Sequence, residues 1–247
     1  MKYLTLINHK KEVIKMKKVP TKVLSILLCI GLVAGLIPGV FATEPTTQTI
    51  EHNGVTYTLT ITYSEEGQQI ATVTGGGVTT SAHFEDDMLI LTETNLVTKE
   101  TTTTVKDLNE ESEFTTASSN HNTRGYYSEQ SQYFNVGYEV TTRSGVDYWM
   151  IWNSDNFAKA VNTPPVDLNL LKDFQEAVNS CCNYEQEFNY EVGSNIIYTV
   201  VNALSGVNGI TAIASVLGLF GIPLAVATIW DNAQRAANLA DFHYDHI

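Results

Sequence analysis

One long stretch without charge places the strongest limit on how this chain can fold. It begins at Val192 and ends at Trp230, and its 39 residues contain no Asp, Glu, Lys, Arg or His. A run of this length is enough for one membrane span of about 20 residues or for a helical hairpin. Helix-breaking residues interrupt it repeatedly, at Gly206, Gly209, Gly218, Gly221 and Pro223. These interruptions favour two helices, residues 195–204 and 210–229, joined through residues 205–209.

Three interpretations of this apolar hairpin, residues 193–230, remain open from the sequence. A fixed membrane anchor fits its length, but the C-terminal flank has one basic residue, Arg235, among three aspartates, whereas anchors have a basic cytoplasmic flank. The hairpin can also be the core of a folded domain. It can finally be a buried hairpin that inserts into a target membrane. In that case the membrane-interacting candidates are Ile196, Ile197, Val200, Val201, Leu204, Ile210, Ile213, Val216, Leu217, Leu219, Phe220, Ile222, Leu224, Val226, Ile229 and Trp230.

The first 42 residues are predicted to be a secretory signal peptide. Seven lysines precede the apolar run at residues 23–33, and Ala42 is the expected cleavage position. This segment predicts a secreted, extracellular protein. It also contains seven of the 14 basic residues and one of the 27 acidic residues, so residues 43–247 hold 7 basic and 26 acidic groups, a net charge of −19. Such a surface repels phosphate backbones and anionic lipid, and we expect no nucleic-acid partner.

Residues 43–108 are predicted to form a β-rich domain, an antiparallel meander. Between Val55 and Tyr63, apolar or aromatic residues alternate with threonines, which is the period of a strand with one face in water. The preceding Asn53-Gly54 pair supplies a tight turn to a partner strand at residues 48–52. Further strands are predicted at residues 69–74, 78–84, 88–94 and 96–105.

The middle of the chain divides into a polar and an aromatic part. Residues 109–124 are predicted to be a linker or surface loop. Residues 125–163 are predicted to be a β or mixed segment, with a hairpin that pairs residues 138–140 with residues 147–152. Its aromatic residues can form a core under the sheet or an exposed stacking surface. They are Tyr126, Tyr127, Tyr133, Phe134, Tyr138, Tyr148, Trp149 and Trp152.

Residues 164–247 are predicted to be a helical region that contains the apolar hairpin. Its first helix, of roughly 20 residues, is amphipathic, because apolar side chains recur at steps of three and four from Leu168. Asp167 favours its first turn. The adjacent Cys181 and Cys182 cannot close a useful loop with each other. A vicinal disulfide, an intermolecular bridge and two buried thiols are all consistent with the sequence.

We find no catalytic signature in the sequence, and we predict neither an enzyme nor a cofactor. The C-terminal residues Asp241, His243 and His246 are weak metal-ligand candidates, since the two histidines lie three positions apart. A solvated helix end explains them better, so we predict no metal. A secreted hydrolase of an unrecognised type would need a pocket that brings a nucleophile and a base together.

These segments together predict an α+β fold, with an N-terminal antiparallel β-meander followed by a C-terminal helical region with an apolar helical hairpin. A signal ending in PGVFA, then HNGVTYTLTITY and ATVTGGG, an acidic middle and a Gly-, Ala- and Ile-rich tail follow in order. This layout resembles the geobacillin-26-like large bacteriocins, secreted unmodified proteins of Gram-positive bacteria that kill related strains. The family offers no catalytic residues to transfer.

The resemblance implies a secreted antibacterial protein that acts on the membrane or envelope of related Gram-positive bacteria. Its partners would be the target-cell membrane or an envelope receptor, and an immunity protein in the producer. Many bacteriocins are cationic, and the net charge of −19 departs from that pattern, so a receptor or a bridging divalent cation would be needed. The alternative function is a non-enzymatic adhesion or binding protein, secreted or on the cell surface, whose apolar tail is an anchor or a helical core.

Overall fold

A computed structural model describes residues 45–109, 121–123, 126–155, 157–162 and 167–247. The expected signal peptide, its cleavage position at Ala42 and most of the 109–124 linker lie outside the described residues. Residues 43–247 form one compact unit with an α+β fold, so the predicted fold class is confirmed.

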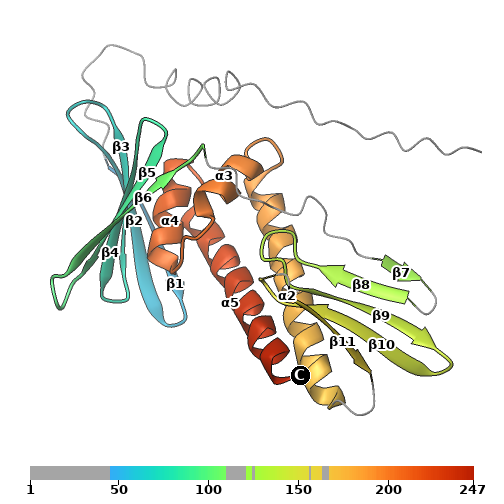
Figure 1. Cartoon of the computed structure of the whole chain (residues 1–247). Helices are drawn as coiled ribbons and strands as arrows, with labels where there is room; N and C mark the ends of the chain where they lie inside the picture. Colours follow the sequence, from blue (N-terminus) through green and yellow to red (C-terminus); the bar gives the residue numbers. More distant parts are fainter. Residues whose placement is uncertain (1–44, 110–120, 124–125, 156, 163–166) are drawn as a thin grey trace, which may run out of the picture. The chain divides into compact units, whose positions relative to one another are not determined.

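Sheet A is the predicted meander (Figure 1). Its strands are hydrogen-bonded in sequence order, each antiparallel to the next. They are β1 (Thr46–His52), β2 (Val55–Tyr63), β3 (Gln69–Gly75), β4 (Val78–Glu85), β5 (Met88–Asn95) and β6 (Thr101–Asp107). The sixth strand was predicted to begin at Leu96. It begins five residues later because the Asn95 side chain accepts from the N–H groups of Val97 and Thr98 and closes a turn there.

Sheet B contains the aromatic segment. Its strand order is β11-β10-β9-β8-β7, again antiparallel throughout. The strands are β7 (His121–Thr123), β8 (Tyr126–Gln130), β9 (Gly137–Arg143), β10 (Val146–Trp152) and β11 (Ala158–Asn162). The predicted hairpin is present as β9 and β10, and its turn residues Ser144 and Gly145 both have positive φ. β8 and β11 were not predicted individually, and β7 lies within residues 109–124, where a linker or surface loop was predicted.

Four helices follow the sheets. They are α2 (Leu168–Val192), α3 (Ile197–Leu204), α4 (Ile210–Leu219) and α5 (Leu224–His246). α2 is the predicted amphipathic helix, and the Asp167 side chain caps it by accepting from Asn169 N at 2.8 Å. The predicted single helix over residues 210–229 is wrong. It breaks after Leu219 because Gly221 adopts φ 70° and Pro223 lacks an N–H group, so that a new helix begins at Leu224.

Two hydrophobic cores stabilise this unit, and both long helices contribute to each. The first core combines the inner face of sheet A with α3, α4, the start of α5 and the end of α2. The second combines sheet B with the earlier part of α2 and the end of α5. Cys181 and Cys182 are free, buried thiols of this second core. The antiparallel packing of α2 against α5 therefore joins the two cores (Figure 1).

Candidate functional site

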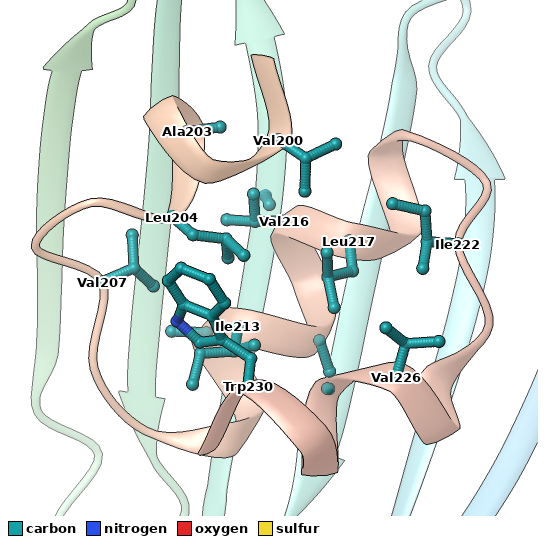
Figure 2. Packing of buried hydrophobic residues seen from close by; sticks show 14 of the residues in the cluster. Val200, Ala203, Leu204, Val207, Ile213, Val216, Leu217, Ile222, Val226 and Trp230 are labelled. Carbon is teal, nitrogen blue, oxygen red and sulfur yellow. The ribbon is translucent and has the colours of Figure 1, made fainter. Parts of the chain in front are cut away.

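The candidate site is the apolar segment, which we define as residues 192–230. All sixteen predicted membrane-interacting side chains are covered in this structure. Twelve are buried, and the remaining four, Ile196, Leu219, Phe220 and Ile229, are partly buried against the same cluster. Figure 2 shows labelled side chains from α3, α4 and α5 gathered among the helix ribbons, in front of the strands. The segment is therefore an internal layer of the first core.

Helix α4 lies directly on sheet A through small and hydroxyl-bearing residues. A Cβ atom at Gly218 would come within 2.9 Å of Leu59 Cδ1 and 3.1 Å of the Ala71 Cβ atom. One helical turn earlier, Ser215 Oγ donates to the Thr80 carbonyl oxygen at 2.8 Å. The Thr80 hydroxyl in turn donates to Thr211 Oγ1 at 3.0 Å. The absence of a side chain at Gly218 therefore brings α4 close to the sheet.

Three sheet A side chains hold the ends of the apolar helices. Lys106 Nζ donates to the carbonyl oxygens of Asn202 and Ser205 at the C-terminal end of α3, both at 2.5 Å. Gln69 Nε2 donates to Gly218 O near the end of α4 at 3.3 Å, and Gln48 Oε1 accepts from Leu224 N at the start of α5 at 2.9 Å. We call these hydrogen bonds the end contacts. Backbone N–H and C=O groups at helix ends have no partner within the helix, so side chains often form hydrogen bonds with them. A positively charged side chain is favourable at the C-terminal end of a helix.

The segment ends at a buried carboxylate. Asp231 Oδ2 lies 2.6 Å from Arg235 Nε and 3.3 Å from Nε2 of His52, which belongs to β1. The Asp231 side chain is only 6 % exposed, whereas that of Arg235 is 62 % exposed. The contact with Arg235 lies within α5, whereas the hydrogen bond with His52 links the start of α5 to β1.

Trp230 connects the apolar segment to the rest of the unit. Its ring centroid lies 4.7 Å from that of Phe188 on α2. It also lies 5.2 Å from the Phe134 ring and 5.7 Å from the Tyr133 ring, both between β8 and β9. Trp230 Nε1 is buried and has no hydrogen-bond partner among the described residues. Leaving such a donor unpaired costs about 1–3 kcal/mol.

A second buried carboxylate was missed at the sequence level. Glu185 accepts from Ser131 Oγ at 2.6 Å and from the N–H groups of Gln132 and Tyr133, both at 2.7 Å. It fixes α2 to the turn between β8 and β9. The helical spacing could have shown that Glu185 is buried. It lies three residues before the buried Phe188 and three or four residues after the buried cysteines, on the same face of α2. Burial raises the pKa of Glu185 above 4.5, although these hydrogen bonds lower it in part.

This raised pKa leads to a pH prediction for stability. The folded state binds the Glu185 proton more tightly than the unfolded state, so this group makes folding less favourable above its folded pKa. Acidification from neutral pH through the raised folded pKa towards 4.5 should then increase the free energy of unfolding. In Glu185→Gln this increase should be smaller. At neutral pH the variant should also be less stable by about 1–3 kcal/mol, because one of the three donors loses its acceptor.

The measurement is urea unfolding at a series of pH values, with Glu187→Gln as the matched control. Glu187 is exposed on the same helix, so its variant changes the net charge equally without touching the turn. Native protein and Glu185→Gln gaining stability in parallel on acidification would contradict the prediction.

The two cysteine thiols are buried in the core, and two of the C-terminal metal-ligand candidates lie in hydrogen-bonding contact with other residues. Burial raises the pKa of both Cys181 and Cys182, so these thiols stay protonated in the core. At the C-terminus, Asp241 accepts hydrogen bonds from the backbone N–H and the hydroxyl group of Ser154 at 2.9 and 2.5 Å. His246 Nδ1 lies 2.6 Å from the Phe242 carbonyl oxygen. No group of three potential metal ligands is found among the described residues.

These features define an α+β protein with an uncharged helical layer enclosed between a β-sheet and two long helices. Within the part of the chain that the structure describes, no helix is both long and apolar enough to cross a membrane. Comparison with protein-family models, with curated proteins and with solved structures finds no match to this chain.

Proposed function

We propose that this protein is a secreted antibacterial protein that acts on the membrane or envelope of related Gram-positive bacteria. In this proposal the apolar segment leaves sheet A and contacts the target membrane. The observation that supports it is the composition of the layer. Within 39 successive uncharged residues, the sixteen candidate side chains are buried or partly buried, in a unit whose net charge is −19. Exposed, such a segment would favour an apolar environment over water.

The contact between the apolar segment and sheet A also suits separation. The surface of α4 that meets the sheet includes Gly218, Ser215 and Thr211, so small and hydroxyl-bearing residues form part of this contact. Gly206, Gly209 and Gly221 adopt positive φ between the helices. These glycines give the connections the conformational freedom that a rearrangement of the short helices requires.

The test is a killing assay on a related Gram-positive indicator strain together with dye release from lipid vesicles. Culture supernatant of a producer should inhibit the indicator, and supernatant of the gene-deleted producer should not. Purified residues 43–247 should reproduce the inhibition and release dye. Inhibition that is equal with and without the gene would contradict the antibacterial proposal. Killing without dye release would contradict only the membrane mechanism and not the antibacterial activity.

A non-enzymatic binding or adhesion protein is the second candidate function. Its supporting observation is that the apolar segment completes the core between sheet A and the long helices, which is a sufficient structural role. Fractionation of the producer separates the two candidates. Adhesion by the protein without inhibition of any indicator strain would favour the second.

A further inference from the structure

The face of sheet A opposite the core carries two aligned ranks of hydroxyl side chains. Strand register places one rank across all six strands: Thr49, Thr58, Thr74, Thr79, Thr94 and Thr101. A second rank lies two positions further along the strands and contains Thr47, Thr60, Thr72, Ser81, Thr92 and Thr103. We call these the threonine ranks. They alternate along the strands with buried residues such as Leu59 and Val73, and they are exposed or half-exposed.

Strand preference alone does not account for this arrangement. Threonine is favoured on exposed strand faces, so it should be as frequent in the next row of the same face. That row is instead mixed: Thr62, Ile70, His83, Ile90 and Val105. The hydroxyl side chains are therefore concentrated in two adjacent, uninterrupted rows.

The ranks form a fixed array of donors and acceptors. Neighbouring strands lie about 4.8 Å apart, and alternate residues of one strand lie about 6.6 Å apart. Threonine side chains have restricted χ1 angles, which limits their movement. Cross-strand hydrogen bonds restrain them further, as between Thr74 and Thr79 at 3.0 Å and between Thr72 and Ser81 at 3.1 Å. Each hydroxyl both donates and accepts.

Charge selects the kind of ligand. The twelve residues of the ranks carry no charge, although residues 43–247 have a net charge of −19. Anionic polymers and anionic membranes are repelled by such a protein, whereas a neutral ligand is not. An extended neutral polysaccharide presents hydroxyl groups at regular intervals, and these can exchange hydrogen bonds with the ranks. The geometry thus points to an uncharged polysaccharide chain as the ligand of this face.

The twist of the sheet favours a single chain over a planar crystal surface. Successive strands rotate by about 20–25°, so a flat lattice such as ice can match only a few neighbouring strands. A flexible chain can follow all six. This binding does not depend on the antibacterial proposal, because it concerns the opposite face of the sheet from the apolar segment.

The test measures binding of residues 43–247 to a linear neutral glucan and to Gram-positive wall polysaccharide stripped of teichoic acid, by affinity electrophoresis. Teichoic acid and ice are the comparison surfaces. We expect retardation by at least one neutral polysaccharide and none by teichoic acid. Thr74→Val with Thr79→Val keeps strand-favouring side chains of similar shape but removes two hydroxyls. Binding should weaken about tenfold, since two hydroxyl groups that can form hydrogen bonds with the ligand are lost.

The matched control lies on one strand. Thr101 and Thr103 belong to the ranks, whereas the exposed Thr102 and Thr104 face the other side. Thr101→Val with Thr103→Val should weaken binding, and Thr102→Val with Thr104→Val should not. The two β6 variants still provide the test if the Thr74→Val, Thr79→Val variant fails to fold. Absence of binding to both neutral polysaccharides, equal effects of the two β6 variants, or rank-dependent adsorption to ice would overturn the proposal.

Discussion

A disulfide bond between residues 80 and 211 is expected to suppress killing almost completely until it is reduced. In the Thr80→Cys, Thr211→Cys variant, sulfur atoms replace hydroxyl oxygens that are 3.0 Å apart. A small side-chain rotation brings them to the bonding distance of about 2 Å. The bond joins α4 to β4 covalently, so α4 cannot leave the sheet while the disulfide is intact.

The assay compares killing and vesicle dye release by the oxidised and reduced forms of the same protein, with the bond verified by peptide mass mapping. The control is Thr142→Cys with Asp147→Cys, a cross-strand pair on the β9–β10 hairpin of sheet B. Oxidation of this control should leave killing unchanged. Full killing by the oxidised 80–211 variant would show that the apolar segment acts without leaving the sheet, and the membrane mechanism would be abandoned.

Trp230→Ala is expected to lower the free energy of unfolding by about 3–5 kcal/mol. The side chain is 2 % exposed, and its ring contacts aromatic rings from α2 and from the β8–β9 connection. Its removal leaves a cavity where the two cores meet. For a domain of this size, the melting temperature should fall by roughly 6 to 20 °C. Part of this loss of stability is offset, because the variant no longer buries an indole N–H group without a hydrogen-bond partner in the described part of the chain.

Phe242→Ala is the matched control for this measurement, since Phe242 is an aromatic residue of the same helix that is 56 % exposed. Its substitution should change stability by about 0.5 kcal/mol or less. Thermal and urea unfolding measure both variants. Similar losses in the two would contradict the prediction, because the buried ring of Trp230 would then contribute no more than an exposed aromatic side chain of the same helix.

The strands of sheet A could be predicted because their signals are local. Between Val55 and Tyr63, the alternation of residue types reports which side chains face the core, and Asn53-Gly54 supplies its own turn geometry. The cap at Asp167 and the apolar side of α2 are local for the same reason. Each of these features depends on residues within a few positions of one another.

The candidate site was harder to predict from the sequence, because the residues that contact one another there lie far apart in the chain. The hydrogen bonds of Glu185 reach a turn more than fifty residues earlier, and the bond between Thr80 and Thr211 spans 131 positions. Composition grouped the sixteen apolar candidates in one segment, and the structure places them in or against one hydrophobic core. Composition could not show that sheet A, and not another helix, packs against Gly218.

The sequence by itself determined that residues 192–230 are uncharged, interrupted by glycine and preceded by an amphipathic helix, because these properties belong to the residues and their spacing. The tertiary structure decided that the segment is an enclosed layer, that its second helix divides after Leu219, and that threonines from six strands align in two ranks. Burial and alignment depend on which distant segments meet, and the free energy of packing between those segments selects that arrangement.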